Sequence, residues 1–439
     1  MKRIAFVFAS VILLVSILTG CGGSPTATQA PADSQAPATE APATEAPASS
    51  GGDEIVIQHW YHQYGEEGTY EAALRYAEEY SKATPGVRVE VTWVPGDYAA
   101  ALNAALLTDE GPDVFELQNV TLDRVAAGQL APLDDLFTGV LEDFNKAAME
   151  RVVVDGTIYG VPMIVDPQFV YYRKSMFANA GIEAPKTMDE LIAASKALSD
   201  GRVKGIYLSN DLGSTSYLLY MKTLAANTEF IKDGKVVINT PDNVRMWQKT
   251  KELADSGSML VGATTEWWDP GALNDGLVAM QWCGLWAMPG VVSALGADEV
   301  GVMPWPALDE NATPSIWLGG WNQSVNAKSS NVEAAKAYVK WLWIENTEVQ
   351  LDWNLSYGFH IPPRASTAAK ADKLQTGPAA EVLAMLPKYG KTTPITWTGA
   401  MDTIYSDAHS AVLLKGADPA EQLAAAAVAA QAELDALLK

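Results

Sequence analysis

The most regular feature of the chain is a repeated change of hydrophobic period in its first folded part. Apolar residues at alternate positions predict strands at 54–60 and 87–93, and an apolar run predicts a third strand at 114–117. Helices are predicted between them at 69–84 and 97–107, because each segment opens on a capping residue and is followed by a Gly/Pro break. Strand, helix, strand, helix, strand indicates a parallel sheet with right-handed crossovers.

The same pattern resumes further along the chain. An apolar, aromatic run at 170–172 is typical of another strand, and Thr187 to Glu190 forms a capping box before a helix that reaches Leu198. Further helices are expected after Thr240-Pro241, after Asn331, and over the alanine-rich tail at 419–438. Two α/β lobes fit these elements better than one long sheet, so the predicted fold class is α/β.

The first 21 residues have the layout of a secretory signal. Lys2 and Arg3 precede an apolar run at 4–18, which is too short for a membrane span with flanks of its own, and Gly20 lies before Cys21. Leu18-Thr19-Gly20-Cys21 resembles the bacterial lipobox, which implies a lipid-modified Cys21 and a membrane-anchored protein. The alternative is a plain secretory signal with a chance cysteine.

The segment that follows, residues 22–53, contains little besides Ala, Pro, Thr, Ser and Glu. It has no large apolar side chain to bury, so it is predicted to be a disordered tether, extended by its prolines. A tail without a role is the alternative. From residue 54 onward the chain is long enough for two packed domains.

Charge and residue usage narrow the functional class. A net charge of −23 argues against nucleic-acid binding, which requires a basic surface. The only other cysteine is Cys283, which we interpret as a small buried apolar residue rather than a reactive thiol. Tryptophan is abundant, with 14 residues that often occur in pairs, and in an acidic exported protein this suggests flat apolar faces for a neutral polar ligand.

Several segments are similar to one family, the extracellular solute-binding proteins of family 1, which are the substrate-capturing subunits of ABC sugar importers. The most specific are Tyr172–Ile182 and Pro185–Leu191; Gly111–Val114, Gly276–Met280 and Gly319–Asn322 are further matches. The resemblance extends from residue 54 to the end of the chain. In this family Asn is common where the chain has Arg173, and Trp where it has Met188, but both lie in structural segments.

The resemblance implies a two-lobe fold of the periplasmic-binding-protein type (type II), with ligand between lobes that are joined by a multi-crossing hinge. Crossings are expected near Asp166, Trp321 and Thr393. Residues 54–165 and 322–390 would form lobe 1, and residues 166–321 and 391–439 would form lobe 2. Ligands of open α/β sheets bind beyond the carboxyl ends of strands, which suits this arrangement.

A sugar offers C–H-rich faces and hydroxyl-rich edges, so its site needs aromatic rings beside paired donors and acceptors. Residues of these types lie after predicted strands, at the expected crossings and in aromatic loops. The ligand-binding candidates are Trp60, His62, Glu66, Gln118, Asn119, Asp166, Trp268, Asp269, Trp286, Gly320, Trp321, Tyr357 and Arg364. Trp267 and Trp268 are adjacent in a loop and their side chains diverge, so we expect Trp268 to serve as the ring platform.

Several candidates have structural alternatives that the sequence leaves open. His62 and Glu66 are also compatible with a solvated loop, and Asn119 with a turn residue. Asp166 is equally compatible with a hinge aspartate, and Arg364 with a surface salt bridge. Trp286 is equally compatible with a core residue, because large aromatic residues near an apolar strand are usually buried.

The predicted function is an extracellular, lipid-anchored, monomeric binding protein that delivers a mono- or oligosaccharide to ABC permease subunits, without a cofactor. One alternative is an exported glycoside hydrolase, for which Glu66, Asp166 and Asp269 are the available carboxylates. Another is a receptor for a quaternary amine with an aromatic cage. No metal site is predicted, because the four histidines lack zinc-ligand spacing.

Overall fold

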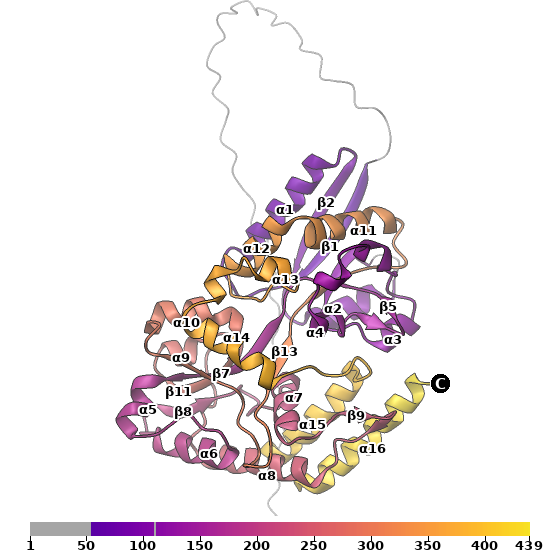
Figure 1. The fold of residues 1–439 in the computed structure, drawn as a ribbon. Helices are drawn as coiled ribbons and strands as arrows, with labels where there is room; N and C mark the ends of the chain where they lie inside the picture. The colour runs from indigo at the N-terminus through magenta and orange to yellow at the C-terminus, as the bar shows by residue number, and fades with distance from the viewer. Residues whose placement is uncertain (1–53, 109–110) are drawn as a thin grey trace, which may run out of the picture. The chain divides into compact units, whose positions relative to one another are not determined.

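The computed structural model describes residues 54–108 and 111–439, and these residues build two separate β-sheets (Figure 1). In Figure 1 the strands β1 and β2 are in the same part of the molecule as helices α1 and α11. The strands β7, β8 and β11 are in the other part, together with α6 and α8. The signal segment, Cys21 and the tether at 22–53 lie outside the described residues.

The first sheet contains the three strands that the hydrophobic pattern predicted. β1 pairs in parallel with both β2 and β3, and β14 enters from far along the chain, antiparallel to β3 and β6. The strand order is β2 (Val87–Val94), β1 (Ile55–His62), β3 (Val114–Leu117), β14 (Asn322–Val325) and β6 (Val161–Pro162). Because β1 and β3 are adjacent and parallel, their carboxyl ends lie side by side at the same end of the sheet.

The second sheet is mixed and is centred on β7, which pairs with β13 over its first residues, with β12 over its last, and with β11 along its other side. Its strands are β15 (Gly390–Lys391), β13 (Ile316–Gly319), β7 (Asp166–Arg173), β11 (Val278–Gly284), β8 (Lys204–Tyr207) and β12 (Val300–Met303). Two short antiparallel ribbons are β4 (Val153–Val154) with β5 (Thr157–Ile158), and β9 (Ile231–Lys232) with β10 (Lys235–Val236).

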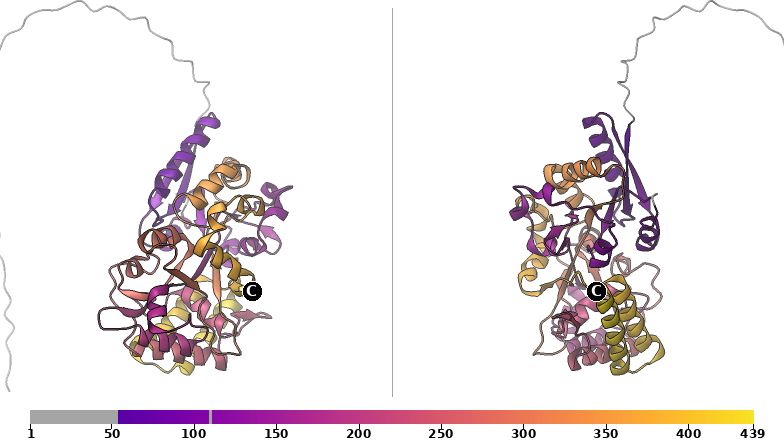
Figure 2. Two further views of the ribbon diagram at one scale, coloured as in Figure 1. Left: turned by 60° about the vertical axis from the view of Figure 1, so that its left-hand side comes forward. Right: turned by 90° about the vertical axis from the view of Figure 1, so that its right-hand side faces the viewer.

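Helices cover both sheets. Those near the first sheet are α1 (Thr69–Ala83), α2 (Tyr98–Ala105), α3 (Leu122–Ala126), α4 (Lys146–Met149), α11 (Val332–Lys340), α12 (Thr347–Leu355) and α13 (Ala365–Ala368). Those near the second are α5 (Lys174–Ala180), α6 (Met188–Ala197), α7 (Ser216–Ala225), α8 (Pro241–Asp255), α9 (Gly271–Asn274), α10 (Met288–Leu295), α14 (Gly377–Tyr389), α15 (Gly399–Lys415) and α16 (Pro419–Leu437). α15 and α16 pack side by side (Figure 2).

Most predicted helix starts are confirmed by their hydrogen bonds. Asp97 accepts from the third backbone N–H of α2, Thr240 caps α8, and the capping box of Thr187 and Glu190 is formed. The prediction for Thr69 is wrong. The N-cap of α1 is Gly68, at φ +93°, and the Thr69 hydroxyl instead donates to the carbonyl oxygen of Glu66 at 2.5 Å.

Apolar side chains gather around each sheet separately. One core lies around the first sheet, with members at 57–164 and 325–353; two adjoining cores lie around the second, with members at 169–317 and 371–434. We call these two parts the first lobe and the second lobe. Residues 371–389, which the sequence analysis assigned to the first lobe, lie in the second, because α14 packs on β12 and β15. The last passage to the second lobe therefore lies between α13 and residue 371, rather than near Thr393.

Candidate functional site

Three segments of the chain meet where the two lobes join and are hydrogen-bonded to one another; those at 163–166 and 319–322 cross between the lobes, and the third contains Ile361. Val165 and Ile361 exchange both backbone hydrogen bonds at 3.0 Å. On the other side of the first crossing, the Met163 N–H donates to the Trp321 carbonyl at 3.0 Å. The segment at 163–166 therefore lies between the other two. The predicted crossings near Asp166 and Trp321 belong to this ribbon, which we call the hinge.

A buried ionic cluster joins the hinge to the loop after β1. His360 Nδ1 lies 2.6 Å from Asp166 Oδ1, and His360 Nε2 lies 3.4 Å from Glu66 Oε1. Burial alone disfavours the imidazolium, but the two carboxylates outweigh it and raise the pKa of His360 to about 10. Burial also works to raise the pKa of Glu66, but His360 outweighs it and holds this pKa below its ordinary value. His360 is therefore a cation at neutral pH.

The first-lobe side of the junction carries an aromatic stack on a buried carboxylate. Glu116 accepts from the His62 backbone N–H at 3.0 Å, from His62 Nδ1 at 2.7 Å, and from the Tyr64 hydroxyl at 2.8 Å. The His62 ring lies 3.8 Å from both the Tyr64 and the Trp321 ring centroids, and it is nearly parallel to Trp321 at 18°. Hydrogen bonds thus hold His62 in one orientation.

The second-lobe side is built from indole rings. Trp267 stacks on Trp282 at 4.2 Å and 12°, whereas Trp268 is 43% exposed, so the two adjacent side chains diverge as expected. Trp286 Nε1 donates to the Trp268 carbonyl at 2.9 Å. Asp269 Oδ1 accepts from the backbone N–H of Gly271 at 2.7 Å, which makes Asp269 a turn residue at the start of α9.

Two contacts span the junction between the lobes. The Tyr217 hydroxyl of α7 donates to Gln118 Oε1 at 2.6 Å, and its ring is stacked on Trp317 at 4.9 Å and 18°. A Cβ on Gly65, in the loop after β1, would lie 2.8 Å from Trp268 Cζ3. The lobes therefore touch at Gln118 and at Gly65.

The remaining first-lobe candidates end close to the hinge. Asn119 Oδ1 accepts from Arg151 Nε at 3.2 Å, and the Gly320 carbonyl accepts from the same guanidinium. Gly320 has φ +125°, and a Cβ there would lie 2.2 Å from the Ile164 carbonyl oxygen, so only glycine fits. Gln118, Asn119 and Gly320 are thus brought together, with Arg151 between them.

Three predicted residues have their partners within the first lobe. Arg364 donates from Nε to Asp143 at 2.9 Å and from Nη1 to a main-chain carbonyl. The Tyr357 hydroxyl lies 3.2 Å from Asp352 and 3.1 Å from Arg75. The Trp60 side chain is half-buried against the first core. The described contacts of Arg364 match the salt-bridge alternative that the sequence left open.

Sequence reasoning missed four residues of the junction: Glu116, Arg151, Tyr217 and His360. A signal existed for Glu116, because a single carboxylate inside the apolar run 114–117 must find buried donors. Tyr217 and His360 have no distinguishing pattern, since each lies among ordinary apolar and aromatic neighbours. The partners of Arg151 come from segments far along the chain, which no local pattern reveals.

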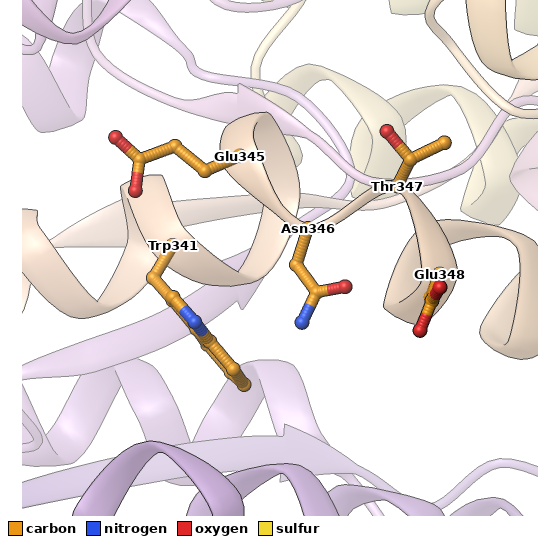
Figure 3. A pocket seen from close by; sticks show the side chains of 5 residues that line it. All are labelled: Trp341, Glu345, Asn346, Thr347 and Glu348. Atoms are coloured by element: carbon orange, nitrogen blue, oxygen red, sulfur yellow. The ribbon is translucent and has the colours of Figure 1, made fainter. Parts of the chain in front are cut away.

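A surface hollow elsewhere on the first lobe has none of these properties. It lies at the turn between α11 and α12 and is lined by Trp341, Glu345, Asn346, Thr347 and Glu348 (Figure 3). The side chains of Glu345 and Thr347 point away from those of Trp341 and Asn346 in this view. The hollow contains no predicted ligand residue and does not resemble a binding site.

Two further properties concern the described part of the chain only. Among residues 54–108 and 111–439, no helix combines the length and apolar character that membrane crossing requires. The same residues contain no group of three or more histidine, cysteine or acidic side chains placed to hold a metal ion. Cys283 is buried, as expected, and burial raises the pKa of its thiol.

Comparison with known proteins relates the chain to a bacterial family. The model of the bacterial extracellular solute-binding proteins matches residues 64–342. An arabinooligosaccharide-binding protein of Bacillus subtilis is 24% identical over 60% of this chain, and the match spans 64% of that protein's length. The diacetylchitobiose binding protein DasA of Streptomyces coelicolor is 28% identical over 73% of this chain and 76% of its own.

The fold is likewise similar to solved structures. The crystal structure of an ABC transporter solute-binding protein from Thermotoga lettingae TMO, bound with alpha-D-tagatose, has a TM-score of 0.75 and 22% identity. The match covers 87% of this chain and 100% of that one. This likeness concerns the fold, and it confirms the two-lobe α/β architecture predicted from the sequence.

Proposed function

The chain belongs to the bacterial extracellular solute-binding proteins, and from that premise we propose that it captures a mono- or oligosaccharide between its two lobes. The bound sugar would be released unaltered to the permease subunits of an ABC transporter. The relatives named above support a sugar as the class of ligand, since their names give arabinooligosaccharides and diacetylchitobiose.

The observation that carries this proposal is the pairing of flat rings with fixed polar groups at the junction. Trp321 is partly exposed on one side of the junction, with His62 stacked against it and bonded to Glu116, and Trp268 offers an exposed indole on the other side. A pyranose or furanose ring has apolar C–H faces and a rim of hydroxyls, so it matches this combination.

Lobe movement follows from the contacts that span the junction. A sugar can enter only when Tyr217 leaves Gln118 and Trp268 leaves Gly65, because both pairs are in contact here. The three hinge segments remain joined by backbone hydrogen bonds, so they are suited to absorb a rotation of one lobe against the other. Sugar binding would then favour the closed state through contacts that the open state lacks.

The electrostatics of the junction support binding rather than hydrolysis. A glycoside hydrolase needs a carboxylic acid with a raised pKa to protonate the leaving group. The pKa of Glu66 is instead lowered, because His360 outweighs the effect of burial. Glu66 is therefore poorly suited to act as the acid of a hydrolase, which supports our proposal that the protein binds its sugar without cleaving it.

The anchor and partners extend the proposal to the cell surface. The lipobox-like sequence before Cys21 supports lipidation of that residue, and the Pro-rich segment at 22–53 would then tether the folded part to the membrane. A monomer that docks on the permease through both lobes is the simplest assembly. Mass spectrometry of Cys21 after expression in a bacterium tests the anchor directly, because an unmodified cysteine contradicts it.

A panel of sugars tests the ligand class. The purified protein is mixed with arabino-oligosaccharides, chito-oligosaccharides, malto-oligosaccharides and monosaccharides, with choline as the control cation. A true ligand should stabilise the fold by ~2.7 kcal/mol at a hundredfold excess over its dissociation constant, and it should change tryptophan fluorescence. Stabilisation by choline alone, or release of a shorter sugar during incubation, would contradict the proposal.

A further inference from the structure

Arg151 is a buried guanidinium whose hydrogen bonds all go to neutral oxygens. It is 3% exposed and lies just after α4. Nε donates to the Gln118 carbonyl at 3.1 Å and to Asn119 Oδ1 at 3.2 Å. The two Nη atoms donate to the carbonyl oxygens of Gln118, Gly319 and Gly320. Burial of a charged group is unfavourable unless its donors are satisfied, and here four acceptors satisfy them.

These acceptors belong to two parts of the junction that are far apart in the chain. Gln118 and Asn119 follow β3 at the carboxyl edge of the first sheet. Gly319 is the last residue of β13, and Gly320 follows it in the hinge crossing that leads to β14. Arg151 therefore connects the residues that follow β3 to a hinge segment through hydrogen bonds, and we call this connection the Arg151 brace.

The fit around this brace is tight. A Cβ on Gly320 would lie 2.9 Å from Arg151 Nη1, in addition to its clash with Ile164. The carbonyl of Gln118 also accepts from Asn322 Nδ2 at 2.9 Å, so the edge is held from β14 as well. A planar fork with five N–H donors reaches four acceptors at once, whereas a lysine ammonium has three donors at a single point.

We propose that Arg151 is a positioning residue for ligand binding, which orients Gln118 and Asn119 by fixing them to the Gly319–Gly320 crossing. The orientation matters because Gln118 is the residue that meets Tyr217 of the second lobe. Arg151 itself need not touch the ligand. This inference rests on the proposed function of the junction as a sugar site.

The test compares Arg151→Lys with wild type in the full-length protein, using a sugar that the panel has identified. We expect affinity to fall about tenfold, since the fork geometry is lost while the charge is kept. Arg173→Lys is the matched control, because Arg173 pairs with Glu299 at the far end of β7 and should bind as wild type does. Unchanged affinity in Arg151→Lys would overturn the inference.

A purely structural role is separated by a double-mutant cycle. If Arg151 acts through Gln118 and Asn119, then Arg151→Lys should have little further effect on affinity in a Gln118→Ala/Asn119→Ala background. Additive losses would overturn the inference. A wild-type protein that binds no sugar would instead contradict the proposed function, so the two failures are distinguishable.

A measurement on wild type keeps the inference testable if Arg151→Lys does not fold. The Arg151 Nε–H can be followed by nitrogen-15 NMR with and without saturating sugar. We expect a shift on binding, because its acceptors Gln118 and Asn119 lie at the binding edge. A resonance that is identical in both states would show that the guanidinium is insensitive to the ligand and would overturn the inference.

Discussion

Different interactions hold the side chains on the two sides of the junction in place. On the first-lobe side, Glu116 and Arg151 are buried charges that hold neighbouring groups by directed hydrogen bonds. On the second-lobe side, Trp267 is held by ring stacking, and Trp268 is 43% exposed, with its carbonyl oxygen accepting from Trp286 Nε1 and Cys283 Sγ. Hydrogen bonds fix direction, whereas stacking fixes a plane but allows sliding.

This difference suggests a division of roles. Under the proposed function, the first lobe would be preorganised to recognise hydroxyl positions, because its polar groups cannot turn without losing buried partners. The second lobe offers an adaptable apolar face. Substitutions on the first-lobe side, and of the charged residue His360 at the hinge, should therefore lower both the free energy of unfolding and the affinity for sugar. Substitution of the exposed Trp268 should lower affinity alone.

The largest effect is expected from His360→Gln, which removes a buried cation from between two carboxylates. The free energy of unfolding should fall by about 3–5 kcal/mol near pH 6.5, because Glu66 and Asp166 lose their partner. The pKa of His360 is raised in the folded state, to about 10, so its contribution is full below about pH 6.5 and is lost as the pH rises through 10. Urea unfolding at several pH values measures this.

His59 provides the matched control. It is also buried, but its pKa is lowered to about 3 by burial, so it is neutral in the folded state across this range. The loss caused by His59→Gln should be the same at pH 7 and pH 10. An equal loss for His360→Gln at those two pH values would contradict a charged His360.

The second-largest effect is expected from Glu116→Gln, which changes the hydrogen bonds on the first-lobe side of the junction. Glu116→Gln replaces an acceptor of three hydrogen bonds, from His62 and Tyr64, with an amide that has one acceptor atom. We expect unfolding free energy to fall by about 2 kcal/mol and sugar affinity to fall about tenfold. Glu90→Gln is the control, with a change below about 0.5 kcal/mol, because β2 is an edge strand and the Glu90 side chain is 44% exposed. Normal affinity in Glu116→Gln would remove the proposed role of the His62 stack.

A smaller effect on stability is expected on the aromatic side. Trp268→Ala should weaken sugar binding about tenfold, while unfolding free energy changes by less than about 0.5 kcal/mol, because the ring is largely outside the core. Calorimetric titration and urea unfolding measure the two quantities. Trp341→Ala, at the unrelated hollow on the first lobe, should leave affinity unchanged. If Trp268→Ala unfolds more easily but binds sugar normally, then this indole has a structural role and the prediction is wrong.

The smallest effect on binding is expected for Arg364→Lys, a residue that the sequence had suggested as a ligand. Its guanidinium is engaged with Asp143 and a main-chain carbonyl, so affinity should stay within about twofold of wild type. Stability should fall by about 1 kcal/mol through the lost hydrogen bond. A tenfold loss of affinity would return Arg364 to the binding site and weaken the contrast between the two sides.

Much of the fold was predictable because its signals are local. The alternation at 87–93 and the capping box at Thr187 depend only on neighbouring residues, and both are found in the structure. The cap at Thr69 failed, since Gly68 adopts a positive φ and takes that position. The apolar face of the helix at 377–389 would be the same whether it packed on the first or the second lobe. Its hydrophobic pattern therefore does not indicate which lobe it covers.

The candidate site was predictable only in part. Residues at or just after the ends of strands, such as His62 and Gln118, are brought to the junction, as are Asp166 and Trp321. The partners that orient them were not foreseen. His360 acquires its role from a side chain 194 positions away in the chain, and Arg151 from a backbone carbonyl 169 positions away.

The sequence by itself determined the α/β class, most of the helix caps and the abundance of indole rings, because period, capping and composition act over a few residues. The tertiary structure alone decided which charges are buried and what they hold. Burial and pairing depend on distances between segments remote in sequence, and it is these distances that make His360 a cation and Arg151 a brace.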